Sequence, residues 1–176
     1  MKSVEVYELT TKGGAGDFAK VVEICQRLGS YCLVGGMAVN CFVEPVYTLD
    51  ADFVLIAARR DALKRELVQS GFSLEEFAHS LNAHAPESEL RIQFTTDPRY
   101  QEFVTRAEEK EVLGVKVRVA RLEDLVQGKI WAFLDPQRRL TKRKKDELDL
   151  LRLAEAYPHL RKLYPPELQR QFDDLA

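Results

Sequence analysis

"YCLVGGMAVNCFVEPVYTLDADFVLIA", residues 31–57, decides the fold of this chain. One apolar run ends at Gly35 and Gly36, and a second begins beside Asp50 and Asp52. Short apolar runs bounded by turn residues predict buried strands, and the "MAVNCFV" segment between them has the composition of a buried helix of about two turns. The stretch therefore predicts a strand, a tight turn, a short helix and a second strand.

The two aspartates of the second strand predict half of a metal site. Side chains alternate along a strand, so Asp50 and Asp52 project to the same side, about 7 Å apart at Cα. Two crowded carboxylates repel each other, and a cation removes that repulsion. Mg²⁺ suits the position because it binds one or two carboxylates and completes its shell with substrate phosphates and water, and Mn²⁺ accepts the same oxygen ligands.

The glycine pair predicts a phosphate site. Gly35 and Gly36 let the backbone approach a ligand without an intervening Cβ, at the point where a helix opens with free N–H groups. Either feature alone is also typical of an ordinary strand-to-helix turn or a solvated strand edge. Together, at this spacing, they favour a triphosphate cradle facing a magnesium-binding strand.

The rest of the chain predicts a mixed α/β (α+β) sheet flanked by helices, with a helical C-terminal section. We expect residues 1–120 to form the α/β core and residues 121–176 to pack on it as one structural domain. Residues 72–88 are difficult to assign. Strands are expected at 3–9, 31–34, 51–57 and 89–96 and on both sides of a turn at Leu113 and Gly114. Helices are expected at 18–28, 37–43, 59–71, 122–133, 145–157 and 165–176, and a flexible connector at 11–17.

Composition restricts the classes of function. The chain has 176 residues, 45% hydrophobic and 31% charged, with a formal net charge of -2. No global field attracts nucleic acid or a membrane, so a charge-based function must be local. Cys25, Cys32 and Cys41 are odd in number and lack zinc spacing, which favours reduced thiols in a cytoplasmic protein. No apolar run reaches the roughly 18 residues of a membrane span, so we expect no membrane partner.

These motifs carry a family resemblance. "VGGMAVN" and "YTLDADFVLI" resemble the nucleotidyltransferase superfamily that includes DNA polymerase β, with Gly-Gly or Gly-Ser at a strand end and Asp-x-Asp on the next strand. With "VKVRVARLEDLVQGKI" and "RKKDELDLLRL", the chain is similar over about residues 30–155 to bacterial minimal nucleotidyltransferases of abortive-infection and toxin-antitoxin systems. The resemblance implies a nucleotidyltransferase-like fold.

The resemblance also implies an activity and roles for particular residues. It implies transfer of a nucleoside monophosphate from a nucleoside triphosphate to a hydroxyl on RNA (tRNA among them), protein or a small molecule. Asp50 and Asp52 would be the catalytic metal ligands, and Gly35, Gly36 and Thr48 would bind the nucleotide. A partner protein from a toxin-antitoxin pair and a link to phage defence are further implications.

Two positions depart from the family pattern. Gln93 stands where a third carboxylate is expected, and an amide cannot accept the proton of an acceptor hydroxyl, a role typically worth about 10² to 10⁴ in rate. Glu89 and Asp97 share the strand parity of Gln93 and are candidate substitutes, each about 13 Å away along the strand. Val46 replaces a common arginine. These departures leave open a slow or specialised enzyme.

Two lysines are further nucleotide-binding candidates. "RRLTKRKKD", residues 138–146, is a basic segment that could contact phosphate or simply be a solvated start of a helix. Within it, Lys145 and Asp146 match the late lysine-aspartate motif, so Lys145 is the phosphate candidate. Lys129 could reach the same pocket or extend along the surface. Trp131 is most simply a core residue.

Three functions remain open on these residues. The first is a magnesium-dependent nucleotidyltransferase of the toxin-antitoxin kind. The second is a catalytically degenerate binding or regulatory protein that keeps the fold. The third is a small-molecule modifier such as an antibiotic adenylyltransferase.

Overall fold

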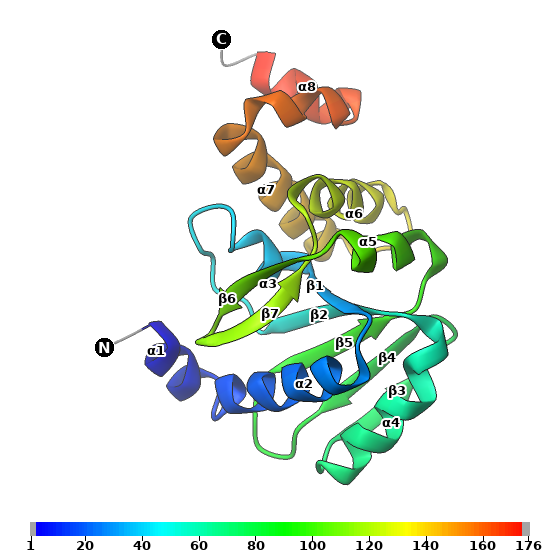
Figure 1. Ribbon diagram of the computed structural model, residues 1–176. Coiled ribbons are helices and arrows are strands. Elements are labelled where there is room, and N and C mark those ends of the chain that lie inside the picture. The colour runs from blue at the N-terminus through cyan, green and yellow to red at the C-terminus, as the bar shows by residue number, and fades with distance from the viewer. Residues whose placement is uncertain (1–2, 174–176) are drawn as a thin grey trace.

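A seven-stranded mixed sheet forms the centre of the molecule in residues 3–173, the part of the chain that the computed structural model describes (Figure 1). The strand order across the sheet is β3-β4-β5-β2-β1-β7-β6. The strands are β1 (Tyr31–Val34), β2 (Asp50–Leu55), β3 (Ser73–Glu76), β4 (Ser80–His84), β5 (Arg91–Thr95), β6 (Glu108–Val112) and β7 (Val115–Val119).

The strand that carries the aspartates lies in the middle of this sheet. β2 is antiparallel to β1 and parallel to β5, and β1 is parallel to β7. The remaining neighbours are antiparallel. The predicted mixed sheet flanked by helices is therefore confirmed, and it brings β1, β2 and β5 together at its centre.

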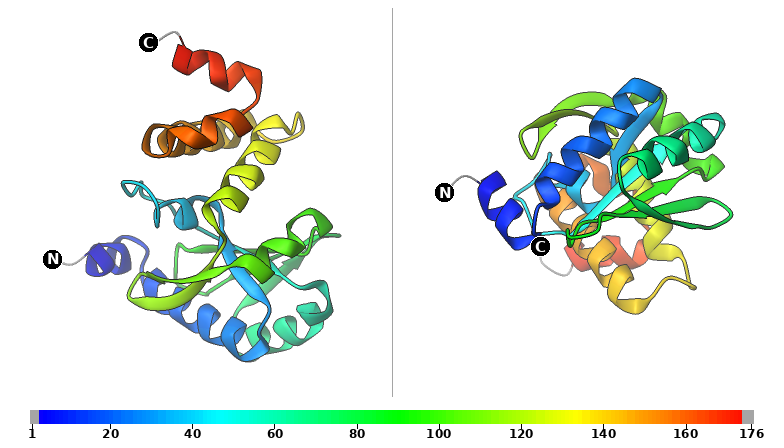
Figure 2. Two further views of the ribbon diagram at one scale, coloured as in Figure 1. Left: turned by 45° about the horizontal axis from the view of Figure 1, so that its top comes forward. Right: turned by 90° about the horizontal axis from the view of Figure 1, so that it is seen from below.

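Helices lie on both sides of the sheet. Figures 1 and 2 show α2 and α4 beside each other on one side, while α6, α7 and α8 stack beyond the other side and lead to the C-terminus. The short α3 joins β1 to the loop before β2 and contacts α6 and α7. The helices are α1 (Ser3–Thr10), α2 (Gly14–Leu28), α3 (Gly35–Val39), α4 (Arg60–Gln69), α5 (Gln101–Arg106), α6 (Leu122–Leu134), α7 (Leu140–Ala156) and α8 (Pro166–Asp173).

Two clusters of buried apolar side chains fill the space between these layers. The larger cluster packs the sheet against α2 and α4, with Phe18, Phe53 and Phe94 stacked in its centre. The smaller cluster joins the C-terminal helices to one another and includes Val39 from α3. Because α3 belongs to the α/β part, we propose that residues 121–176 form one structural domain with it.

The predicted strand at residues 3–9 is wrong, because this segment is the helix α1. The residues of this segment that face inward, Val4 and Tyr7, have a helical spacing of three, and the buried Thr11 follows four positions later. Thr11 is completely buried, and its Oγ1 accepts a hydrogen bond from the Gly14 backbone N–H at 2.9 Å. This contact fixes the turn between α1 and α2.

Other boundaries differ from the predictions in smaller ways. The expected connector at 11–17 is short, because α2 already begins at Gly14. The helix after the glycine pair begins at Gly35 and ends at Val39, earlier than predicted. The unassigned segment 72–88 forms the hairpin β3–β4, and the helix α5 was not predicted at all.

The cysteines are free thiols, as their odd number and spacing predicted. Cys25 and Cys32 are buried free thiols, and Cys41 is a half-buried one. In the part of the chain that the structure describes, none of the helices is both long enough and apolar enough to cross a bilayer.

Candidate active site

Asp50 and Asp52 share the open face of β2. The strand alternates so that Ala51 and Phe53 are completely buried on the other face. Across the sheet, Asp52 lies opposite Val34 of β1 and Gln93 of β5. The two carboxylates are thus presented beside the glycine turn that ends β1.

Gly35 is in direct contact with Asp52. Its φ is +72°, a conformation that favours glycine, and a Cβ at this position would collide with Oδ2 of Asp52 and lie 3.0 Å from its Cβ and Cγ. A Cβ on Gly36 would lie 3.7 Å from Oδ2 of Asp149 and 3.9 Å from Oγ1 of Thr48. The predicted juxtaposition of the glycine turn and the acid pair is confirmed.

Asp50 is held by two cations. Nζ of Lys142 lies 2.8 Å from its Oδ2, and Nε of Arg91 lies 2.8 Å from its Oδ1. Burial alone would raise the pKa of Asp50, but the hydrogen bond from Lys142 and the charges of Lys142 and Arg91 hold that pKa below its usual value. Asp50 is therefore ionised at neutral pH, with a lysine at one of its oxygens.

Asp52 has the opposite electrostatic environment. Burial, and after it the negative charge of Asp50, raises the pKa of Asp52 to about 6. The cations near it, of which Lys129 has the largest effect, only partly offset this rise. The carboxylate pair is thus destabilised as a dianion, a condition that a bound divalent cation relieves.

Lys129 lies inside a buried ion-pair network between α6 and α7. Its Nζ is 2.9 Å from Asp146 and 2.7 Å from Asp149, and its side chain is only 11% exposed. Burial lowers the pKa of Lys129, but the two carboxylates outweigh burial and the net shift is upward. Arg138 and Arg152 bind the same two carboxylates from the other side. Lys129 is therefore a buried cation and does not extend along the surface.

A cavity of about 360 Å³, here called the basic cavity, opens between these groups. It is lined by Gly36 and Thr48, and Thr48 Oγ1 accepts a hydrogen bond from the backbone N–H of Asp50 at 3.1 Å. Its charged lining comprises the carboxylates Asp50, Asp52, Asp146 and Asp149 and the cations Arg91, Lys129, Arg138, Lys142, Lys145 and Arg152. The excess of cations suits a polyanion.

Lys145 is the cation of this cavity that is least engaged. Within residues 3–173 its side chain makes no ion pair or hydrogen bond, although its charge helps to lower the pKa of Asp50. Val46 lines the same cavity as Arg91 and Arg152, which pair with Asp50 and Asp149. The structure thus brings together the predicted residues Gly36, Thr48, Lys129 and Lys145.

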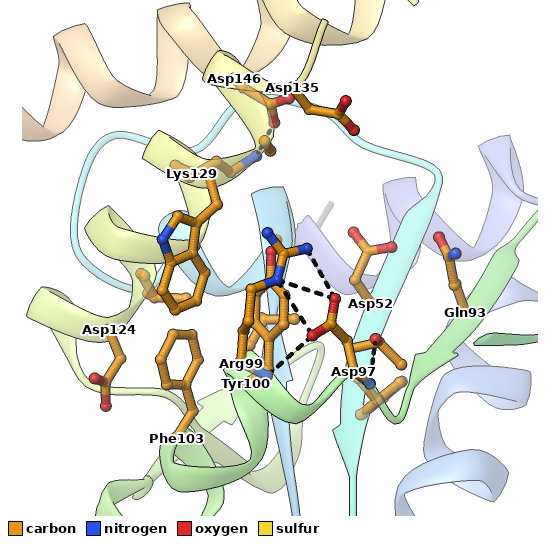
Figure 3. Close-up of a pocket in the computed structure, with 18 of the residues that line it drawn as sticks. Asp52, Gln93, Asp97, Arg99, Tyr100, Phe103, Asp124, Lys129, Asp135 and Asp146 are labelled. Atoms are coloured by element: carbon orange, nitrogen blue, oxygen red, sulfur yellow. Dashed lines mark hydrogen bonds and ion pairs between the residues drawn. The ribbon is translucent and has the colours of Figure 1, made fainter. Parts of the chain in front are cut away.

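A second cavity of about 280 Å³, here called the aromatic cavity, also borders Asp52 (Figure 3). Tyr100, Phe103 and Trp131 line it, so Trp131 is a cavity residue as well as a partner of the core. The two cavities share Asp52, Gln93, Lys129, Arg138 and Asp146.

The carboxylates proposed to replace the third acid have different positions. Gln93 faces Asp52 across the β2–β5 register. Glu89 is 49% exposed, pairs with Lys12 at 2.7 Å and lines neither cavity. Asp97 lines the aromatic cavity, where Arg99 binds its carboxylate at 2.8 Å and holds its pKa below the usual value. Only Asp97 of the two is placed beside the site.

The residues present fit a cation whose shell a substrate completes. Within the described residues, no three His, Cys, Asp or Glu side chains converge on a metal position. Asp50 and Asp52 nevertheless supply the one or two carboxylates that Mg²⁺ commonly takes when phosphate oxygens and water provide the remaining ligands.

Sequence reasoning missed several residues of this site. Arg91 precedes Gln93 by two positions, so strand alternation places both on one face. Asp149 follows Asp146 by three positions, so helical spacing places both on one face of α7. Lys142 gave no comparable signal, because its contact with Asp50 depends on how α7 packs.

The fold and the site define a nucleotidyltransferase-like protein. The solution structure of the antibiotic-resistance factor ANT(2'')-Ia is similar, with a TM-score of 0.59 and 17% identity over 92% of this chain and 94% of that chain. Lincomycin-bound LnuA, a lincosamide antibiotic adenylyltransferase, gives a TM-score of 0.57 at 12% identity over 80% of this chain and 96% of that chain. JHP933 from Helicobacter pylori gives a TM-score of 0.54 at 17% identity over 90% of this chain and 70% of that chain.

At these identities the three structures show the shared fold alone. No curated protein matches the chain. A family model described as the nucleotidyl transferase AbiEii toxin of type IV toxin-antitoxin systems matches residues 29–174. The chain belongs to this family.

Proposed function

We propose that the chain transfers a nucleoside monophosphate from a nucleoside triphosphate to a hydroxyl acceptor. The observation that carries this proposal is the contact of the Gly35 turn with Asp52 at the edge of a cavity rich in cations. A polyphosphate placed there meets the first N–H groups of α3, the acid pair and Lys145 at once. Membership of the family supports the same reaction class.

The chemistry of the transfer assigns a role to each group. An oxygen of the acceptor forms a bond to the α-phosphorus, the bond from that phosphorus to the pyrophosphate breaks, and the hydroxyl proton is released to solvent. Asp50 and Asp52 would hold Mg²⁺ or Mn²⁺, which when bound neutralises charge on the reacting phosphate. Lys145 and Lys129 would stabilise the negative charge of the phosphates, and Gly35 and Gly36 would let the chain approach them.

The acceptor is RNA, protein or a small molecule, and the family suggests an antitoxin protein as partner. The test uses the purified protein with each of the four nucleoside triphosphates labelled at the α-phosphate, with Mg²⁺ or Mn²⁺ and a cell extract. We expect label on one class of acceptor, and loss of labelling in Asp50→Asn and Asp52→Asn. Labelling that persists in both variants would contradict the proposal.

The second candidate is a binding protein with a degenerate site. It is favoured by Gln93 in the place of a carboxylate and by the neutralisation of Asp50 by Lys142 and Arg91. This candidate predicts triphosphate binding without label transfer in any extract, while Gln93→Asp restores transfer.

A further inference from the structure

We propose that the aromatic cavity binds the nucleobase and ribose of the nucleotide whose triphosphate lies in the basic cavity. This inference rests on the proposed function and adds where the nucleoside part of the donor lies. The two cavities meet at Asp52, Lys129 and Arg138, which line both of them. One molecule with a flat end and a polyanionic end, joined at its α-phosphate beside Asp52, matches this arrangement.

The two cavities differ in the charge of their linings. The basic cavity has six cationic side chains against four carboxylates. The aromatic cavity has three cationic side chains against five carboxylates. Its carboxylates are Asp52, Asp97, Asp124, Asp135 and Asp146 and its cations are Arg99, Lys129 and Arg138. A triphosphate is therefore repelled from the aromatic cavity, whereas an uncharged nucleoside is not.

The walls of the aromatic cavity suit a flat ring. Trp131 stacks on Phe103 with ring centroids 5.8 Å apart at 6°, and Tyr100 meets Trp131 edge to face at 5.2 Å. The guanidinium carbon of Arg99 lies 5.5 Å from the centre of the Trp131 ring and 5.9 Å from that of Tyr100. Nucleobases stack on aromatic rings and on arginine planes alike.

Arg99 is the most exposed residue of this wall, so a ligand that enters the cavity contacts it first. Its side chain is 58% exposed, while Phe103 is almost completely buried behind the ring of Trp131. Asp97 fixes the guanidinium through Nε at 3.2 Å and Nη2 at 2.8 Å, and it also accepts the Arg99 backbone N–H at 2.9 Å. In Figure 3 the Arg99 and Asp97 side chains lie between the aromatic rings and Asp52. The wall therefore presents a held, planar cation next to the reacting position.

Trp131 is the only tryptophan of the chain, so its fluorescence reports on this cavity alone. The experiment titrates the full chain, with Mg²⁺ present, with each nucleoside triphosphate and with inorganic tripolyphosphate. Calorimetry measures binding, and tryptophan emission measures occupation of the aromatic cavity. Free tryptophan titrated in parallel corrects for absorption by the bases. We expect the preferred nucleoside triphosphate to change the emission, and tripolyphosphate to bind without changing it.

Two variants and a control make the test specific. Arg99→Ala removes the planar cation, and Ala132→Leu fills the cavity from α6 without deleting a contact group. Both should raise the Kd of the nucleoside triphosphate about tenfold or more, the size of one lost base stack, and change the Kd of tripolyphosphate less than about twofold. Arg65→Ala, on the exposed face of α4, should change neither.

The outcomes separate this inference from the proposed function. Nucleoside triphosphates that bind as tightly as before in Arg99→Ala and Ala132→Leu, with unchanged Trp131 emission, would overturn the placement of the base but leave transfer intact. A change in emission that tripolyphosphate causes as strongly as the nucleoside triphosphates would also overturn it. If neither nucleoside triphosphate nor tripolyphosphate binds, the proposed function itself fails.

Discussion

Nζ of Lys142 lies 2.8 Å from Oδ2 of Asp50, although 92 residues separate the two in the sequence. This ammonium group, with Arg91 on the other oxygen, supplies the positive charge that the acid pair requires when no ion is bound. A divalent cation that binds Asp50 must compete with it. We therefore predict that Lys142 lowers the affinity of Asp50 for a divalent cation.

Replacing Lys142 should increase the effect of metal on stability. In Lys142→Ala, one compensating charge is lost and Oδ2 of Asp50 becomes available, so added Mn²⁺ should raise the Tm more than it does in the unmodified protein. Thermal unfolding with and without Mn²⁺ measures this. The control Lys144→Ala removes a lysine of the same helix that pairs with Glu147 instead. An equal gain in Tm for both variants would contradict the competition.

Gly35→Ala should destabilise the protein more than Gly71→Ala does. Both glycines have a positive φ, +72° and +90°, so both substitutions carry a backbone strain of about 1–2 kcal/mol. A Cβ at Gly71 meets nothing within 4 Å, whereas one at Gly35 collides with Asp52. Urea unfolding of the two variants isolates the collision, and equal losses would show that Asp52 moves aside freely.

Stability should depend on pH through Asp52. Its pKa is about 6 in the folded protein and near 3.8 in the unfolded chain, so between about pH 4 and 6 the folded state binds more protons. This contribution therefore makes the protein less stable as pH rises through that window. Asp52→Asn removes it and should be more stable than the unmodified protein at pH 7, by about 3 kcal/mol.

The measurement is chemical unfolding of both proteins at several pH values in the absence of metal. The contribution of Asp50 to stability changes with pH in the opposite direction. Its lowered pKa stabilises the folded state at neutral pH, and this stabilisation is lost on acidification. Taking the difference between the two proteins cancels the contributions of groups that do not interact with Asp52. A difference that is independent of pH would show that Asp52 does not titrate in this range.

Gln93→Asp should increase both the affinity of the site for a metal ion and the rate of nucleotidyl transfer. The new carboxylate would face Asp52 across the sheet, and we expect transfer to rise by about 10²-fold, the lower end of a general-base contribution. Asn82→Asp is the matched control, because Asn82 lies opposite Gln93 on β4 and adds the same charge one strand further away. Equal rates in the two variants, measured with labelled triphosphate, would show that the missing acid does not limit the reaction.

Asp146→Asn should be strongly destabilising. It removes charge from a carboxylate that binds Lys129 at 2.9 Å and Arg138 at 2.6 Å, and breaking such a buried pair typically costs about 3–5 kcal/mol. Glu147→Gln is the neighbouring control, because its partner Lys144 is largely exposed and the loss should stay below about 1 kcal/mol. Similar losses for the two variants, measured by urea unfolding, would contradict the structural role of Asp146.

The central features of the fold could be predicted because their patterns are local. The Gly35 turn, the alternation of Asp50 and Asp52 and the strand β5 each follow from a few adjacent residues. The first helix was mistaken for a strand because Val4 and Val6 alternate as in a strand, whereas the residues that face the core, Val4 and Tyr7, have the helical spacing of three. The partners of Asp50 escaped prediction for a different reason: Lys142 and Arg91 reach it only through the packing of α7 and the register of β5.

The order of the chain places the acid pair of β2 far ahead of α7, whose lysines complete the basic cavity. During synthesis on a ribosome, Asp50 and Asp52 emerge long before Lys142 and Lys145. A growing polypeptide therefore lacks the lysine that pairs with Asp50 until 92 further positions have been translated. The basic cavity is therefore assembled only after α7 has been made, although its acids are among the earlier residues of the fold.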